Sequence, residues 1–530
     1  MFGPDIIFFN GNVRTFDPAN TLASAVALKG SKIVAVGGED VRRLAGNDTR
    51  AIDLKGRTLI PGFIDPHVHM KEAQKYERGL DGAADKAELL AKLAEVLRRH
   101  EGGGWQIVSC SVNRSELWPL ASDLDAIVND RPVVLTLGGH VYATNTAGLR
   151  AAEITRETPH PFGGRIEHDA ITGEPNGLLM DTARHLVLKR MERSNQPKTP
   201  LKEKILFSLA ELGRCGITTV HDMVNAAEDV RTYQELENEG RLTACIHLLM
   251  RVKESKFDLE SLVQLGITTG FGGRIKFGGV KLSYDGQFPS RGALMAEPYY
   301  GTDQTGAARV PLPELRRVVS LAHANDIRFC IHAYGDRATD EVLDAYEEAI
   351  TSHPEKVLRH RIEHAGNVLC TDERIARMKR LGVMAVPNPS FLRSRGRMAE
   401  PWLGPVRGTR ISRVKSILNS GCSIAVGTDW PGLQYISPLQ CIESMVTRKT
   451  GEGVVLDEDE AIDAEAALRL YTVNNAYAGY EEHSKGTIEV GKQADVAVLD
   501  DDPVRVDPNR IGAIAVNYTV SDGRIVYNGS

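Results

Sequence analysis

Residues 312–350, LPELRRVVSLAHANDIRFCIHAYGDRATDEVLDAYEEAI, decide the fold class of this chain. An amphipathic helical stretch leads into the apolar run IRFCIH, which ends in a polar loop and is followed by a second helical stretch. The same alternation of strand, loop and helix recurs in residues 216–252, 358–382 and 383–429. This pattern is typical of a parallel sheet covered by helices, so it predicts an α/β fold.

Polar or charged residues stand where these apolar runs end, which is the position of active sites in (β/α)8 barrels. A doubly wound sheet is the structural alternative, but no G-x-G-x-x-G motif opens a βα unit. We therefore predict a (β/α)8 TIM barrel for residues 61–484. Residues 76–200 interrupt the alternation, and we interpret them as an insertion that covers the mouth of the barrel.

The two ends of the chain differ from its middle. Residues 1–60 and 485–530 consist of short β-branched runs punctuated by Gly-containing turns. Each end is too short to enclose a core of its own. We expect the two ends to pair into one composite β-domain, with the barrel inserted between them.

The composition, 42% hydrophobic and 25% charged, is that of a globular protein and argues against disorder or coiled coil. A net charge of −6 gives no general attraction to nucleic acid or to anionic membranes. No apolar run reaches about 18 residues, and the N-terminus lacks a basic region typical of signal peptides. Seven cysteines without a C-x-x-C pair suggest reduced thiols. We expect a cytoplasmic homodimer with a small-molecule partner.

The sharpest local motif is PGFIDPHVHM, residues 61–70, in which His67 and His69 are two positions apart. On a strand these side chains point to the same side, where two imidazoles can bind one divalent metal. Two histidines in a turn would be the ordinary alternative. Four later strand ends each add one candidate ligand, namely Lys281, His332, His364 and Asp429. A lone buried His or Asp is more often a core residue, but candidates in five separate units favour a shared site.

These motifs resemble the amidohydrolase superfamily, and within it amidohydrolase family 3, which includes N-substituted formamide deformylases. The similarity covers essentially the whole chain and rests on PGFIDPHVH, GHVYATNTAGL, GVKLSYDG, HAYGDRATD, RIEHA, VGTDWP and GTIEVGKQADVAVLD. The resemblance implies a distorted (β/α)8 barrel with a binuclear metal centre and a β-sandwich built from both termini.

The resemblance also implies a role for each candidate ligand. His67, His69 and Asp429 would bind the more buried metal, and His332 and His364 the second. Lys281 would be carboxylated and would bridge the two ions, because a free ammonium has no lone pair for a cation. If Lys281 instead points outward or pairs with Asp285, the centre would be mononuclear. Zinc is the default metal, although iron, manganese or cobalt would fit similar ligands.

Further residues are candidates for the substrate pocket. His140 resembles a family position that projects from the insertion toward substrate, although it could be an ordinary loop histidine. His221 ends another strand and is more often a residue that supports ligands than one that contacts substrate. Tyr284 and Trp430 are aromatic candidates near strand ends. Asp336 and Arg337 would orient His332.

Some positions depart from the family pattern or remain ambiguous. Pro66 replaces a small polar residue, LGGH lacks an acidic residue before its glycine, and Gln287 and Phe288 follow the DG of the lysine motif. The pocket is therefore expected to differ from those of characterised relatives. The stretch 391–408 carries Arg393, Arg395, Arg397 and Arg407. A solvated basic loop is its more ordinary interpretation, and a clamp for a substrate carboxylate is the alternative.

The predicted reaction is hydrolysis of an amide-type C–N bond in a small N-acyl or N-substituted compound. A metal-activated hydroxide would attack the carbonyl, with Asp429 as general base. An ester or lactone hydrolase, or a decarboxylase or deaminase on the same scaffold, remains an alternative. An inactive metal-bound scaffold would be expected to have lost a ligand, and none of the six is replaced.

Overall fold

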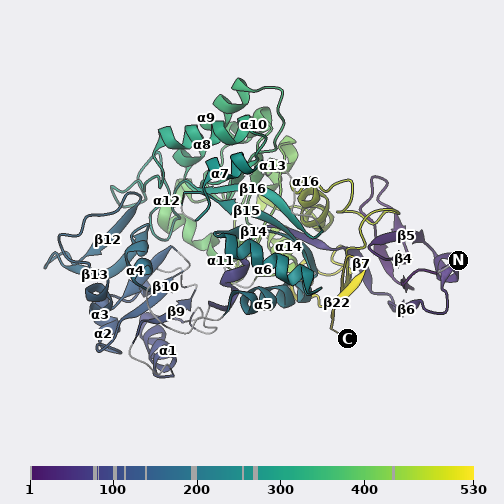
Figure 1. Ribbon diagram of the computed structural model, residues 1–530, viewed down its shortest axis with the longest axis horizontal. Helices are drawn as coiled ribbons and strands as arrows, with labels where there is room; N and C mark the ends of the chain where they lie inside the picture. The colour runs from purple at the N-terminus through teal and green to yellow at the C-terminus, as the bar shows by residue number, and fades with distance from the viewer. Residues whose placement is uncertain are drawn as a thin grey trace.

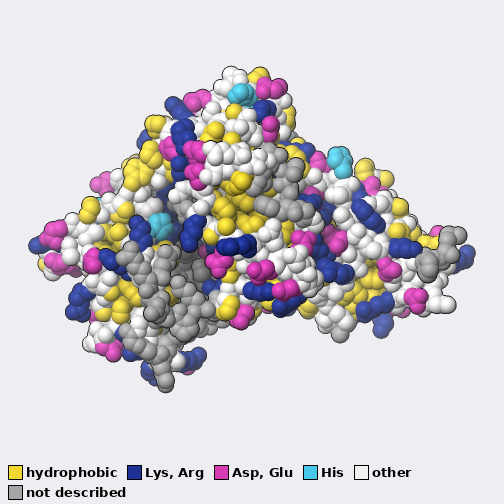
Figure 2. Space-filling model, in the orientation of Figure 1, with side chains coloured by type: hydrophobic (Ala, Val, Ile, Leu, Met, Phe, Trp, Pro, Cys, Tyr) yellow, Lys and Arg dark blue, Asp and Glu magenta, His cyan; other side chains and the backbone are white. Residues whose placement is uncertain are grey.

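The computed structural model describes residues 3–75, 80, 83–99, 104–110, 112, 115–137, 140–191, 200–253, 256–266, 273–431 and 436–529. Figure 1 shows a central body of helices around a parallel sheet, a lobe on one side of it, and strands from both chain ends on the other side. The α/β fold expected from the alternating pattern is therefore confirmed. On the face in Figure 2, basic and acidic side chains are interspersed and form no extended area of one sign.

The central sheet contains seven parallel strands, and each strand pairs with the next one along the chain. They are β8 (Phe63–Val68), β14 (Ile217–Val224), β15 (Cys245–Arg251), β16 (Ile275–Ser283), β17 (Phe329–His332), β18 (Arg361–Glu363) and β19 (Met384–Val386). Residues 423–430 form parallel bridges to both edge strands, Ile424 with Ala385 of β19 and Trp430 with Val68 of β8. The two edges of the sheet are thus linked, and the carboxyl ends of its strands lie at one rim.

Amphipathic helices cover this sheet because each buries one apolar side. In α9, Val342, Tyr346 and Ala349 follow the three- to four-residue spacing of a helix face and are buried. Helix α10 begins after Thr371, whose hydroxyl accepts from the backbone N–H of Arg374, and it ends at Gly382 in the left-handed conformation. The helices are α5 (Leu201–Arg214), α6 (Ala227–Asn238), α7 (Leu259–Leu265), α8 (Leu312–Ala324), α9 (Asp336–Ser352), α10 (Asp372–Leu381), α11 (Pro389–Arg395), α12 (Ala399–Arg407), α13 (Val414–Ser420), α14 (Pro438–Thr447), α15 (Ala464–Arg469) and α16 (Asn475–Ala478).

The lobe lies within the stretch that the sequence marks as an insertion. It has its own five-stranded sheet, in the order β12-β13-β11-β10-β9, and its own hydrophobic clusters. Its strands are β9 (Gln106–Cys110), β10 (Val133–Leu137), β11 (Val141–Thr144), β12 (Gly164–His168) and β13 (Pro175–Asp181). Its helices are α1 (Lys86–Arg98), α2 (Ala121–Asp125), α3 (Thr146–Ala151) and α4 (Arg184–Met191). We refer to the described residues between 83 and 191 as the insertion lobe.

Both ends of the chain contribute to one six-stranded sheet, in the order β22-β21-β20-β7-β2-β3. A four-stranded sheet, β5-β4-β1-β6, shares a hydrophobic cluster with it, in which Phe8 and Val498 are fully buried. The strands are β1 (Ile6–Phe9), β2 (Asn12–Arg14), β3 (Leu22–Ala23), β4 (Ala25–Lys29), β5 (Lys32–Gly37), β6 (Arg50–Asp53), β7 (Thr58–Pro61), β20 (Val496–Leu499), β21 (Val516–Ser521) and β22 (Arg524–Asn528). The union of the two ends is therefore a structural feature of the chain.

All seven cysteines are free thiols. Within the part of the chain that the structure describes, no helix has the length and apolar character needed to cross a bilayer.

A buried ion pair joins the two chain ends and makes their union testable. Nε and Nη2 of Arg14 each lie 2.7 Å from a carboxylate oxygen of Asp502, and these side chains are 7% and 9% exposed. Asp502→Asn should lower the free energy of unfolding by about 3–5 kcal/mol, because the buried Arg14 guanidinium loses the carboxylate that contacts two of its nitrogens and keeps only Glu465, at 4.0 Å. Chemical denaturation followed by tryptophan fluorescence measures this loss.

The matched control is Asp501→Asn. This neighbouring carboxylate is 53% exposed and lies 3.9 Å from Arg510. Its loss should change stability by less than about 1 kcal/mol. Equal effects of the two variants would show that the Arg14 pair does not hold the ends together.

Candidate metal centre

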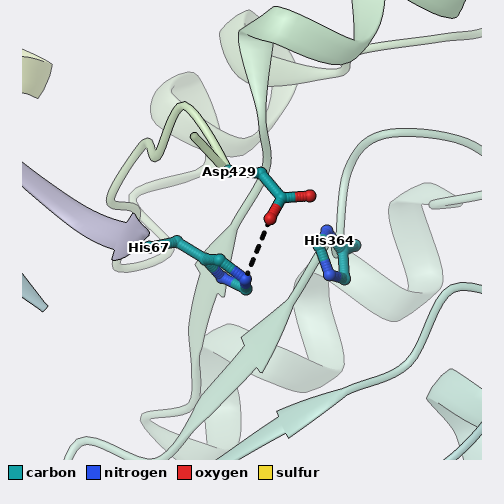
Figure 3. Close-up of side chains that lie close together, drawn as sticks. All are labelled: His67, His364 and Asp429. Atoms are coloured by element: carbon teal, nitrogen blue, oxygen red, sulfur yellow. Dashed lines mark ion pairs between the residues drawn. The ribbon is translucent and has the colours of Figure 1, made fainter. Parts of the chain in front are cut away.

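The predicted ligands lie at the carboxyl rim of the parallel sheet. His67 is the residue before the last one of β8, and His69 follows that strand directly. Lys281 belongs to β16, His332 ends β17, and His364 follows β18. Asp429 comes from the segment that links the two edge strands. Figure 3 shows that the side chains of His67, His364 and Asp429 point toward one another.

The distances define a compact cluster of donor atoms. Ligand atoms of His67, His364 and Asp429 all lie within 4.8 Å of one another. Oδ1 of Asp429 lies 3.5 Å from Nε2 of His67 and 3.2 Å from Nε2 of His69. The ring of His332 is 4.5 Å from that of His364, measured between centroids. The structure therefore brings these five predicted ligands together.

Two of these residues have unusual backbone conformations. His364 has φ 72° and Asp429 has φ 55°, the left-handed region that non-glycine residues seldom adopt. Such strain persists only where the surroundings enforce it, and it is concentrated at functional sites. The conformation of each residue is therefore consistent with a site-specific role.

The charge of Lys281 acts on His67 and His364 and, in addition to burial, lowers the pKa of both rings. Its side chain is buried, and Nζ has no hydrogen-bond partner among the described residues. Burial lowers the pKa of Lys281 to about 8, which makes the neutral amine accessible near neutral pH. Asp285, considered as its ion-pair partner, instead accepts hydrogen bonds from the backbone N–H groups of Leu294, Tyr334 and Gly335.

The chemistry of the donor set fits a divalent cation. Burial and the nearby Lys281 lower the pKa of His67 to about 4, and burial and His67 lower that of His364 to about 3, so both rings are neutral at pH 7. Neutral imidazole is the form that binds metals. Burial alone would raise the pKa of Asp429, but the three histidines His67, His69 and His364 hold it below its usual range, so the carboxylate is ionised.

A second group of potential ligands, Cys245, His247 and Glu481, lies near the opposite ends of the strands. Its carboxylate is already neutralised, since Glu481 forms ion pairs with Lys276 and Lys485. Two ammonium groups beside the only carboxylate oppose cation binding. This group fits a buried ion-pair network better than a metal site.

Sequence reasoning missed the residues that hold the ligands in place. Glu363 is fully buried, and its Oε2 lies 2.5 Å from Nδ1 of His67. Arg361 donates to Glu363 at 2.7 Å and to the carbonyl oxygen of Pro66 at 2.8 Å. Nδ1 of His364 lies 2.6 Å from Oδ1 of Asn388. Since Nδ1 of each histidine is engaged, Nε2 is left for a metal.

One sequence signal could have revealed this support. Arg361 and Glu363 are charged residues at alternate positions of the short strand RIE, just before a ligand. Alternate positions of a strand point to the same face of the sheet, so the two charges lie on one face. Burial alone would raise the pKa of Glu363, but Arg361, His67 and Lys281 hold it well below the usual range.

Of the two histidines predicted for the pocket, one lies beside a predicted ligand and the other lies among the supporting residues. His140 lies at the centre, where its ring stacks on that of His332 with 6.0 Å between centroids. His221 is fully buried in the interior, where Arg361 lies 2.9 Å from its Nδ1 and its ring stacks on His247 at 4.4 Å. Its contacts are therefore with the supporting residues.

The two aromatic candidates, Tyr284 and Trp430, have contacts away from the predicted ligands. The hydroxyl of Tyr284 donates to Glu341 of α9 at 2.5 Å. Trp430 lines a pocket of about 340 Å³ together with residues of α5 and α14. Tyr334, which is not among the predicted pocket residues, stacks on His364 with 4.6 Å between ring centroids. Tyr334 also packs against Phe288 and Phe391.

The residues expected to orient His332 have other partners. Asp336 accepts from the backbone N–H of Ala296, and Arg337 donates to Glu341. Nε2 of His332 instead lies 3.1 Å from the carbonyl oxygen of Gly286.

The arginine-rich stretch forms helices α11 and α12 rather than a loop. Arg393 pairs with Glu443, Arg397 pairs with Glu452, and Arg407 donates to backbone carbonyls. Arg395 is buried and donates to Oε1 of Gln287 at 3.0 Å. The stretch is therefore packed against the protein and is not a solvated loop.

Known proteins resemble this chain in sequence and in structure. The model of the amidohydrolase family matches residues 50–527. The chain is 29% identical to the N-substituted formamide deformylase of Arthrobacter pascens, over 99% of this chain and 98% of that protein. Structures of uncharacterized metal-dependent hydrolases from Pyrococcus furiosus and Pyrococcus horikoshii are similar, at 27% and 25% identity. Their TM-scores are 0.72 and 0.73, over 94% and 96% of this chain and 100% and 99% of theirs.

The contact between Glu363 and His67 predicts an effect on metal affinity. Glu363→Gln removes the charge that fixes the His67 ring, so affinity for added zinc should fall about 10- to 100-fold. Competition between the metal-depleted protein and a chromogenic chelator measures the affinity. Glu460→Gln is the control, because Glu460 is a buried partner of Arg413 that has no contact with the predicted ligands. Equal affinity of the Glu363 variant and the wild type would contradict the supporting role.

Proposed function

The chain belongs to the amidohydrolase family, and from this premise we propose that it is a metal-dependent hydrolase of amide-type C–N bonds in small N-acyl or N-substituted compounds. The observation that carries this proposal is the convergence of His67, His364 and Asp429 beside the buried amine of Lys281. The relative from Arthrobacter pascens, a deformylase of N-substituted formamides, supports amides as the substrate class.

We infer two divalent cations, with zinc as the first choice. His67, His69 and Asp429 would hold one cation, and His332 and His364 the other. Lys281 would bridge them as a carbamate, formed when its neutral amine adds to CO2 and releases a proton. The pKa of about 8 supports this step, because an appreciable share of the amine is neutral near pH 7.

Bound in this centre, the cations would lower the pKa of a water molecule and polarise the carbonyl of the substrate. The residues of the chain would carry the remaining roles. Asp429 would take the proton of the attacking water and pass it to the leaving nitrogen. His140, stacked on His332, would contact the substrate carbonyl from the insertion lobe.

The proposed fold is a distorted (β/α)8 barrel, residues 61–484, in which residues 423–430 act as the eighth strand. The bridges of Ile424 and Trp430 to the two edges support this interpretation. Residues 1–60 and 485–530 would form the composite β-sandwich, and residues 76–200 would form the insertion at the mouth. Active sites of such barrels lie at the rim where the predicted ligands converge.

Metal content tests the bridged centre. Protein purified without chelator should contain about two zinc ions per chain, and Lys281→Ala should contain one or fewer, because the bridge between the two ions is lost. Mass spectrometry of metals on gel-filtered protein measures the ratio. Lys276→Ala is the matched control, since Lys276 lies on the same strand but pairs with Glu481. Equal metal content in all three proteins would show that Lys281 does not bridge two ions.

Turnover tests the reaction class. Zinc-loaded protein should release the amine from at least one member of a panel of N-substituted formamides and N-acyl amides. Asp429→Asn should lower kcat about 10²- to 10⁴-fold, because the proton acceptor is lost. Matched esters and lactones in the same panel distinguish an amide hydrolase from an ester or lactone hydrolase, which is the closest alternative. Cleavage of esters without cleavage of any amide would overturn the proposed substrate class.

A further inference from the structure

The insertion lobe reaches the metal centre through His140, and the backbone ties this residue to the end of β13. The backbone N–H of Asp181 donates to the carbonyl oxygen of His140 at 2.7 Å. Asp181, the last residue of β13, has φ 50°. Non-glycine residues seldom adopt this conformation, so the surroundings of Asp181 must enforce the turn of the chain there.

The side chains of these residues form a closed triangle with an arginine of the central body. Nδ1 of His140 lies 3.0 Å from Oδ1 of Asp181 and 2.8 Å from Nη2 of Arg309. The same Nη2 also binds Oδ1 of Asp181. Nδ1 of the neutral ring can either accept from Arg309 or donate to Asp181, and in both cases Nε2 is left for a substrate.

This ion pair is buried and charge-balanced. Asp181 is 3% exposed and Arg309 is 7% exposed. Burial alone would raise the pKa of Asp181, but Arg309 and His140 hold it below the usual range. Burial and Arg309 lower the pKa of His140 to about 4, so the ring is neutral at pH 7.

The carboxylate of Asp181 fits closely between Ser290, Gly286 and Gly292 of the central body. Ser290 donates to its Oδ2 at 2.9 Å. A Cβ at Gly286 would lie 2.7 Å from Oδ1, and a Cβ at Gly292 would overlap Oδ2. Arg309 is itself fixed, because its backbone N–H donates to the carbonyl oxygen of Tyr284 at 2.7 Å. A lobe residue is therefore held on three sides by residues of the central body.

We propose that Asp181 and Arg309 form a clamp that positions His140 over the metal centre, so that the insertion lobe is a working part of the active site. An ion pair that only docked the lobe would not need both partners on one nitrogen of His140, a ring stacked on a predicted ligand. Asp181 and Arg309 are positioning residues, and His140 is the residue that meets the substrate. The proposal rests on the function proposed above.

The first test is a double-mutant cycle on the zinc-loaded full-length protein. Asp181→Asn should lower kcat/KM about 10- to 100-fold, because the His140 ring loses its fixed position, while zinc content stays as in the wild type. In the His140→Gln background the same change should alter kcat/KM by no more than about twofold. Full additivity of the two losses would show that Asp181 does not act through His140 and would overturn the clamp.

Two further variants keep the test decisive if Asp181→Asn folds poorly. Gly292→Ala keeps the charge of Asp181 but must displace its carboxylate, so it should lower kcat/KM in the same direction, again without further effect in His140→Gln. Arg309→Lys keeps the charge, but the ammonium of lysine ends short of the position of Nη2, the atom that contacts both partners, so this variant should also lower kcat/KM. Asp502→Asn is the control, a buried Arg–Asp pair remote from the site, and it should leave kcat/KM unchanged.

A structural measurement separates failure of the clamp from failure of the proposed reaction. Crystal structures of zinc-loaded wild type and Asp181→Asn should show the His140 ring stacked on His332 in the first and displaced in the second. This comparison needs no turnover, so it supports the clamp even if no amide is cleaved. An unmoved His140 ring in the variant would overturn the clamp whatever the reaction.

Discussion

The site depends on backbone pairing between the first strand of the sheet and the segment that follows its last strand. The N–H of Asp429 donates to the carbonyl oxygen of His67 at 3.0 Å, and the N–H of His69 donates to that of Trp430 at 2.8 Å. These bonds join parts of the chain that are remote in sequence. Because they fix the register, the Asp429 carboxylate lies between the two histidines of the H-x-H motif.

Burying so many charges at one rim requires compensation, and the surrounding residues supply it. Glu363 lies between Arg361 and His67, and Asp181 lies between Arg309 and His140. An unpaired buried charge costs several kcal/mol, so each of these groups has a partner with a full or partial opposite charge. The same carboxylates orient the imidazole rings. Charge balance and ligand geometry are therefore achieved by the same contacts.

The accessory parts of the chain have different relations to this centre. The terminal strands share a core and an ion pair with one another, on the side of the central body opposite the lobe in Figure 1. The insertion lobe has its own sheet and hydrophobic clusters, yet its residue His140 stacks on His332 at the rim. The ends thus contribute stability, whereas the lobe contributes a side chain to the centre.

The sequence by itself determined the α/β alternation and the strand ends that bear His67, His364 and Asp429, because periodicity and motif spacing are local properties. It could not identify Asn388, Asp181 or Arg309 as supporting residues, since their partners are remote in sequence. Nor could it assign Tyr284 and Trp430, whose side chains bind or line regions other than the centre. Only the tertiary structure decided these contacts, because the partner that satisfies a buried polar group is set by the packing of distant segments.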